Sequence, residues 1–259
     1  MLVWIYWIVS LTIVTYASVY IVRNYPKYAF AALTGFYIIY LGASQILASR
    51  IIEFDLGFTV LVAPASVFIY PFIAQVIDMI NEAYGRAMAH GAILIAFLTQ
   101  VLLVIFFVMV NSLTPAPFFA YETAWQAIFA QSIRITIASW IAFLICANLD
   151  AYVFAALKDR FMHRERAFRH GTMANPWVWL RSSVSDAVDL TLDSVIFVVI
   201  AFAGVLPLLP LIVGQVVAKN IIGFIDNPWF VWYKAMLNKD GKTPGGDMDK
   251  QNLTTQKPN

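Results

Sequence analysis

The sequence is poor in charge and holds a single cysteine. Only 12% of its 259 residues are charged, while 61% are hydrophobic. A soluble domain carries about 25% charged residues and could not cover so much apolar surface, which excludes an ordinary soluble fold. The one cysteine, Cys146, lies within an apolar run. A lone cysteine cannot form a disulfide inside the chain, and this one fits a packing role better than a nucleophilic one.

The sequence also lacks the residue patterns of common catalytic and metal sites. His90, His163 and His170 have no partner at metal-ligand spacing. Residues 241–243 resemble the end of a phosphate-binding loop, but Met236 stands where that loop needs its first glycine. No histidine pair and no Ser/His or Cys/His arrangement falls at one depth of the apolar segments. We therefore expect no enzyme activity, no bound metal and no cofactor.

Seven long apolar segments are what the sequence does have. Stretches of about 20 apolar residues with few charges favour membrane-spanning helices over a barrel of alternating strands. We predict an all-α, polytopic membrane helix bundle over residues 1–237, followed by a polar, disordered cytoplasmic tail over 238–259. The predicted helices span residues 1–22, 28–49, 58–85, 89–110, 123–157, 177–203 and 211–233.

Basic residues set the orientation of this bundle. One set of alternate loops holds nearly all of the 17 lysines and arginines, whereas the other set holds only Arg50. Because cytoplasmic loops are enriched in basic residues, we expect a cytoplasmic C-terminus and an outside N-terminus, in the cell membrane. The largest basic run, residues 158–169, sets topology and can bind anionic lipid. It is too isolated to favour a nucleic-acid partner.

The stretch from Tyr70 to Arg86 carries polar side chains where lipid would tolerate none. At about 100° per residue, Gln75, Asp78 and Glu82 share one helical face, and Asn81 lies beside Asp78. A helix end in cytoplasmic water would explain Glu82 more readily than Asp78, which lies deeper in the segment. This face is therefore a candidate for ligand binding.

Three stretches, in order along the chain, resemble one family. The first contains Pro71-Phe72, Asp78 and residues 84–86; the second runs over residues 134–154 and the third over residues 181–202. Together, across about residues 28–236, they are similar to the queuosine precursor transporters, also called the vitamin uptake transporter family. The resemblance implies a core of six helices. The first predicted helix, residues 1–22, would then be an extra N-terminal span.

Three charged residues lie about ten residues into three different predicted helices: Arg134, Asp193 and Lys219. A charge at the bilayer centre costs at least about 2.5–3.5 kcal/mol, so three charges at one depth indicate a single buried polar site. Asp186 and Asp189 would lie toward its cytoplasmic side. The alternative is a structural ion pair, such as Arg134 with Asp193, that only orients the helices. The surplus of acids over bases argues against that alternative for the whole set.

The resemblance implies a 7-deazaguanine substrate, either a cyano or aminomethyl queuosine precursor (preQ0 or preQ1) or queuine. A carboxylate, Asp78 or Asp193, would accept the N1–H and 2-amino hydrogens of such a base as a pair. A donor, Arg134 or Lys219, would serve O6, and aromatic side chains would hold the ring plane. The expected substrate-binding residues are Gln75, Asp78, Asn81, Arg134, Asp189, Asp193, Lys219, Gln215, Phe72 and Trp140.

We predict a transporter that imports this base by alternating access around the buried site. Its partners are the small-molecule base and the lipid bilayer, and a homodimer is allowed. An alternative is a substrate-binding subunit of a vitamin uptake system that needs a separate ATPase. An intramembrane enzyme and an assembly protein fit less well, because no catalytic pair is present and an assembly protein does not need three midplane charges. The exact substrate, the coupling ion and the oligomeric state stay open.

Overall fold

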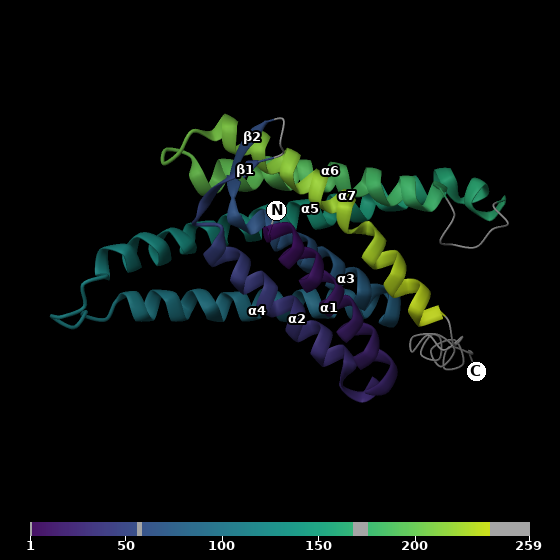
Figure 1. Cartoon of the computed structure of the whole chain (residues 1–259), viewed down its shortest axis with the longest axis horizontal. Helices are drawn as coiled ribbons and strands as arrows, with labels where there is room; N and C mark the ends of the chain where they lie inside the picture. The colour runs from purple at the N-terminus through teal and green to yellow at the C-terminus, as the bar shows by residue number, and fades with distance from the viewer. Residues whose placement is uncertain (1, 56–58, 168–175, 239–259) are drawn as a thin grey trace, which may run out of the picture. The chain divides into compact units, whose positions relative to one another are not determined.

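The structure is a computed structural model that describes residues 2–55, 59–167 and 176–238, with side chains described over 3–53, 59–146 and 187–237. Over these residues the chain forms seven α-helices, a two-stranded sheet and a short 3-10 helix (Figure 1). In chain order they are α1 (Leu2–Asn24), α2 (Pro26–Leu47), β1 (Ile51–Asp55), β2 (Val60–Pro64), η1 (Ala65–Phe68), α3 (Tyr70–Tyr84), α4 (Arg86–Asn111), α5 (Glu122–Ala167), α6 (Pro176–Phe202) and α7 (Leu208–Asn238).

The chain divides into two compact units. The first, here called the α1–α3 unit, comprises Met1–Leu41, Pro71–Thr99 and Asp226–Asn259. The second, the α5–α6 unit, comprises Gly42–Tyr70 and Gln100–Ile225. Helices α2, α4 and α7 therefore each contribute one part to each unit.

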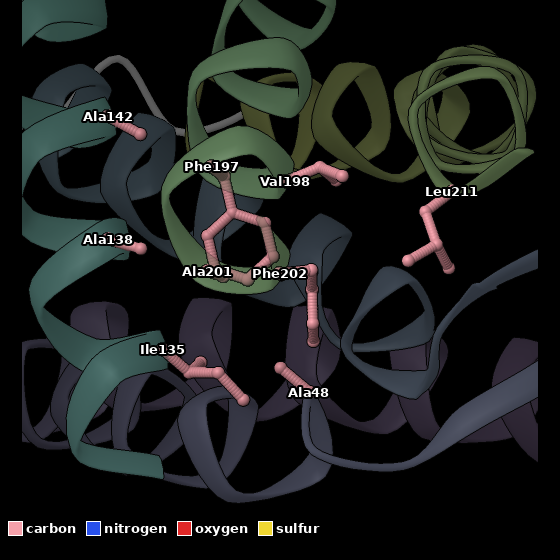
Figure 2. Close-up of a cluster of buried hydrophobic side chains, with 9 residues drawn as sticks. All are labelled: Ala48, Ile135, Ala138, Ala142, Phe197, Val198, Ala201, Phe202 and Leu211. Atoms are coloured by element: carbon pink, nitrogen blue, oxygen red, sulfur yellow. The ribbon is translucent and has the colours of Figure 1, made fainter. Parts of the chain in front are cut away.

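In the α5–α6 unit, α5 and α6 lie side by side (Figure 1). Ala138 and Ala142 of α5 and Ala201 of α6 are fully buried, and small residues at such positions let two helix backbones approach closely. Two aromatic rings of α6, Phe197 and Phe202, fill the space beside them (Figure 2). The remaining members of this core are Ala48, Ile135, Val198 and Leu211.

The long fifth helix extends further than predicted. At about 1.5 Å per residue, the 46 residues of α5 are about 69 Å long, more than twice the roughly 30 Å of bilayer hydrocarbon. Part of α5 therefore lies beyond the hydrocarbon layer. The basic residues up to Ala167 belong to this helix, whereas the sequence prediction ended it at residue 157.

The predicted helix over residues 58–85 is where the structure departs most from the sequence prediction. Its first part is a strand, β2, which pairs antiparallel with β1; η1 follows, and α3 begins only at Tyr70. The hairpin is rich in β-branched residues, which favour a pleated backbone. A continuous apolar run does not by itself distinguish a helix from a buried strand, which is why the prediction made one helix of both.

Two prolines mark the ends of the elements in this stretch. Pro64 is the last residue of β2, opposite Ile51, and a proline is tolerated at a strand end because it is not needed as a ladder donor there. Pro71 lies in the first turn of α3, where its missing N–H has no helical acceptor in any case. At 15 residues, α3 is about 22 Å long, too short to cross the hydrocarbon layer by itself.

The hairpin contacts α7 at a single glycine. A Cβ built on Gly214 would lie 2.0 Å from the backbone carbonyl oxygen of Val62 in β2. No side chain fits in that gap, so glycine is required for the hairpin backbone to approach the helix this closely. The contact places β2 next to the position on α7 that precedes Gln215.

In the α1–α3 unit, the first helix packs on α3 and α7 through aromatic rings. The Trp7 ring lies 6.3 Å from that of Phe72 in α3 and 6.2 Å from that of Trp229 in α7, both edge to face. The Trp229 Nε1–H also donates a hydrogen bond of 2.9 Å to Thr12 Oγ1. Helix α1 is thus held by specific contacts within its own unit.

Among the described residues, five helices are long and apolar enough to cross a membrane: α1, α2, α4, α5 up to Cys146, and α7. The predicted all-α membrane helix bundle is confirmed. The hairpin of β1 and β2 is the part of it that is not helical. The count of seven spans stays a prediction. Residues 239–259, predicted to be a disordered tail, lie outside the described residues.

Candidate functional site

An ion pair joins α6 to α7 inside the α5–α6 unit. Lys219 Nζ donates to Asp193 Oδ2, and the two side chains are only 5% and 15% exposed. The same ammonium lies 4.0 Å from the centroid of the Tyr70 ring, in cation–π contact. We call Asp193, Gln215, Lys219 and Tyr70 the α6–α7 cluster. Taking two charges out of water is costly unless they are paired and hydrogen-bonded. Here the Lys219 ammonium and the Asp193 carboxylate are paired with each other.

Gln215 extends this cluster by one helical turn. It lies four residues before Lys219 on α7, so the two side chains occupy the same face. Gln215 is 1% exposed, and its Oε1 accepts no hydrogen bond from the residues that the structure describes. Asp189, one turn before Asp193 on α6, is half-buried. The cluster therefore offers a carboxylate, an ammonium and a free carbonyl acceptor close to one aromatic ring.

Arg134 takes a different place from the one expected. Its Nε donates to the carbonyl of Ile200 at 3.0 Å and its Nη2 to that of Ala203 at 2.7 Å. Gln131, three residues earlier, donates to the carbonyl of Ala201 at 3.3 Å. Both side chains thus bond to backbone carbonyls at the C-terminal end of α6. The last carbonyls of a helix have no partner within the helix, and the helix dipole favours a cation at this end.

The three midplane charges consequently do not all meet. Ile200 and Ala203 lie seven to ten residues beyond Asp193 on α6, or roughly 10–15 Å along the helix axis. Asp193 and Lys219 are in contact, whereas the Arg134 side chain lies at the C-terminal end of α6. The structural ion pair that the sequence suggested for Arg134 and Asp193 is replaced by Lys219 with Asp193.

A second buried glutamine in this unit has a structural partner. Gln45 of α2 is 2% exposed, and its Oε1 accepts a 3.0 Å hydrogen bond from Thr136 Oγ1 of α5. Thr136 is fully buried as well. This hydrogen bond links two helices inside the protein.

In the α1–α3 unit, the buried face of α3 carries one polar side chain, Gln75. It is 3% exposed, and its neighbours on the helix, Phe72, Val76 and Met79, are all buried. Neither Gln75 Oε1 nor Gln75 Nε2 has a hydrogen-bond partner among the described residues. Phe72, also expected at the site, packs between Trp7 at 6.3 Å and Tyr40 at 5.5 Å between ring centroids.

The acidic positions of α3 lie on its outer side. Asp78 and Asn81 are exposed, although Asp78 was expected to be deep in the segment. Glu82 is half-buried and accepts a 3.1 Å hydrogen bond from Lys234 Nζ of α7. The face predicted to be shared by Gln75, Asp78 and Glu82 is therefore divided, with only Gln75 turned into the packed interior.

The other predicted residues are placed as follows. Trp140 is a half-buried residue of α5, six positions after Arg134. The side chain of Asp186 lies outside the described residues. Among the described residues, no group of three or more His, Cys, Asp and Glu side chains is arranged to hold a metal ion.

Sequence reasoning did not foresee two members of these sites. Tyr70 was read only as the start of a polar stretch, yet its ring covers the Lys219 ammonium. Gln131 was not among the expected site residues, yet it donates to a carbonyl at the end of α6. Its spacing of three residues from Arg134 on one helix was the available signal, because residues three apart share a face.

Several long apolar helices make this a multi-pass membrane protein, and a buried ion pair among such helices is an arrangement typical of membrane transporters. The model of one protein family, described as "Putative vitamin uptake transporter", matches residues 64–233. The chain belongs to this family. It is accordingly a membrane transporter and not an enzyme.

A named relative agrees with this family. The chain is 30% identical over 171 residues to a "Probable queuosine precursor transporter" of Bacillus subtilis (strain 168), a match that covers 64% of this chain and 69% of the relative. No solved structure matches. The family match contains both the α6–α7 cluster and Gln75, while α1 and α2 precede it.

Proposed function

We propose that this transporter imports a queuosine precursor, a 7-deazaguanine such as preQ0, preQ1 or queuine. Family membership and the name of the Bacillus relative support the substrate class. The observation that carries the proposal is the buried ion pair of Asp193 and Lys219, with Tyr70 and the unpaired Gln215 Oε1 beside it.

The hydrogen-bonding edge of a guanine-like base matches this cluster. Its N1–H and 2-amino group are donors and lie next to O6, which is an acceptor. Asp193 can accept from the two donors, and Lys219 can donate to O6. A base can thus replace each ion's present partner with hydrogen bonds, which a purely apolar ligand could not do. Gln215 Oε1 is available for a further N–H.

The two other candidates for these roles are less suited to them. Arg134 already donates to two carbonyls at the end of α6, and releasing it would leave those carbonyls unsatisfied. Asp78 is exposed on α3, so its carboxylate is not enclosed by packed side chains as Asp193 and Lys219 are. We therefore assign the base edge to Asp193 and the O6 donor to Lys219.

The direction of transport is part of the same proposal. The basic residues favour an outside N-terminus and a cytoplasmic C-terminus. An importer would bind the base from the outside and release it on the basic, cytoplasmic side, with the α6–α7 ion pair re-forming after release.

Uptake into proteoliposomes by the purified chain tests the proposal. We expect time-dependent uptake of labelled preQ1 without ATP or a second subunit, and competition by preQ0 and queuine but not by biotin or riboflavin. Asp193→Asn and Lys219→Met should each reduce uptake by tenfold or more while the protein stays folded. Uptake that begins only when a separate ATPase is added would favour the substrate-binding subunit instead.

Ligand-dependent thermal stability checks binding separately from transport. A ligand that binds only the folded protein, at 100 times its dissociation constant, stabilises it by about 2.7 kcal/mol, which is a readable shift of the melting temperature. A shift with deazaguanines supports the proposal. A shift only with a vitamin would keep the transporter class and replace the substrate.

A further inference from the structure

Neither the oxygen nor the nitrogen of the buried Gln75 amide has a partner among the described residues, which distinguishes it from another buried glutamine, Gln45. Both side chains are at most 3% exposed. Gln45 Oε1 is bonded to Thr136 Oγ1 at 3.0 Å, whereas neither the oxygen nor the nitrogen of Gln75 meets a donor or acceptor among the described residues.

The surroundings of Gln75 make its presence costly to the folded protein. Phe72 precedes it by one turn of α3, and Val76 and Met79, at most one turn away, are 0% exposed. An amide in apolar surroundings with no hydrogen bond has lost its water and gained nothing in return. A leucine would fill a similar volume without that loss. The described residues therefore give no structural reason for an amide at this position.

We infer that Gln75 is a substrate-recognition residue that binds a ligand edge with one N–H donor beside one acceptor. A primary amide presents its C=O and its NH2 side by side, so it bonds to such an edge with both groups at once. The inference rests on the proposed function for the ligand class. A free 7-deazaguanine has three edges of this kind: N1–H with O6, the 2-amino N–H with N3, and N9–H with N3.

An aromatic surface lies close enough to assist. The Phe72 ring is on the same face of α3 as Gln75, and planar bases pack favourably against aromatic rings. The inference concerns the α1–α3 unit by itself. It requires only that the base meets this amide at one stage of its passage.

The first arm of the test measures the ligand-free protein. Gln75→Leu should raise the melting temperature of the purified, detergent-solubilised chain by a few degrees, because it removes an unsatisfied buried amide. Gln45→Leu is the matched control and should lower the melting temperature, because it removes the buried hydrogen bond that joins Gln45 to Thr136. A lower melting temperature for Gln75→Leu would overturn the inference, since the amide would then be satisfied in the protein.

The second arm measures ligand affinity by the thermal shift with preQ1 and with its 1-methyl, N2,N2-dimethyl and 9-methyl derivatives. Gln75→Leu should weaken binding of preQ1 by tenfold or more, while Gln45→Leu should leave it within about twofold of wild type. The methyl group that blocks the edge read by Gln75 should weaken wild-type binding to the same extent. The Gln75→Leu variant should be indifferent to that methyl group.

The outcomes separate this inference from the proposed function. If wild type binds none of the deazaguanines, the proposed function fails, and with it the ligand class assigned to Gln75. If wild type binds preQ1 and Gln75→Leu binds it equally well, only the inference fails. Equal sensitivity of wild type and Gln75→Leu to all three derivatives would also overturn it, because none of the three edges would then be read by this residue.

Discussion

The α6–α7 cluster and the buried face of α3 place polar groups among apolar helices in opposite ways. Asp193 and Lys219 are paired with each other, so the charges are balanced inside the protein. Gln75 has neither of its amide atoms bonded among the described residues. A polar group that is satisfied within the fold can be retained for stability, whereas an unsatisfied one costs stability and needs a reason in function. To bind a ligand, Asp193 and Lys219 must replace the bond between them with bonds to the ligand. The Gln75 amide only has to gain a partner.

The largest expected effect comes from breaking the ion pair on one side. Asp193→Leu leaves the Lys219 ammonium buried and unpaired, and should destabilise the protein by about 3–5 kcal/mol. Lys219→Met should cost a similar amount for the opposite reason. Thermal or denaturant unfolding in detergent measures both.

The double variant, Asp193→Leu with Lys219→Met, is the control that sharpens the comparison. It removes both charges, so its cost should be well below the sum of the two single costs. It should nevertheless lose uptake, because the groups assigned to the base are gone. Costs that simply add would show that the two charges do not depend on one another, and the contrast with Gln75 would then disappear.

Arg134 should be the next most sensitive position. Arg134→Met removes two charge-assisted hydrogen bonds to carbonyls at the end of α6, which we expect to cost about 3 kcal/mol. The expected loss is one of stability, with the substrate affinity of the folded fraction little changed. A variant that stays as stable as wild type but binds preQ1 tenfold more weakly would instead return Arg134 to the substrate site.

Gly214→Ala tests whether the α6–α7 cluster depends on the hairpin. The new Cβ would lie 2.0 Å from the Val62 carbonyl oxygen, so the strand must move away from α7. We expect a cost of about 1–3 kcal/mol, as for overpacking of a core, and weaker substrate binding because Gln215 is the next residue.

Gly35→Ala on α2 is the matched control for this substitution. No atom lies within 4 Å of the added Cβ, and alanine is the better helix former. Its stability should therefore equal or slightly exceed that of wild type. A loss at Gly35 as large as the loss at Gly214 would mean that the close backbone contact is not what makes Gly214 sensitive.

Much of this fold could be predicted from the sequence, and the failures have physical causes. Long apolar runs identified the helices, because backbone groups in lipid must be satisfied within a segment. The hairpin over residues 51–64 was missed, because β-branched apolar residues suit a buried strand as well as a lipid-facing helix. Only the contact of Val62 with Gly214, some 150 residues apart in sequence, reveals where the strand packs.

The candidate site could be predicted in part for a related reason. Charges in apolar segments are conspicuous, so Asp193 and Lys219 were found as site candidates, and the structure places them together. Which charges pair depends on helix rotation and offset, which composition does not encode; Arg134 was for this reason given the wrong neighbours. A buried glutamine is ordinary in a sequence. The difference between Gln45 and Gln75 exists only in their partners.

The smallest effect is expected at an ion pair in the same unit as Gln75. Lys234 and Glu82 are 31% and 23% exposed, respectively, so water and salt screen their attraction far more than that of the α6–α7 pair. Glu82→Gln should cost no more than about 1 kcal/mol, and this cost should shrink as salt is raised. A double-mutant cycle with Lys234→Met at low and high salt measures the coupling. A coupling as large as that of Asp193 with Lys219, unchanged by salt, would mean that burial does not explain the contrast between the two pairs. The Tyr233 hydroxyl, which donates to the Met79 carbonyl at 3.2 Å one turn before Glu82, would then be the next contact to remove.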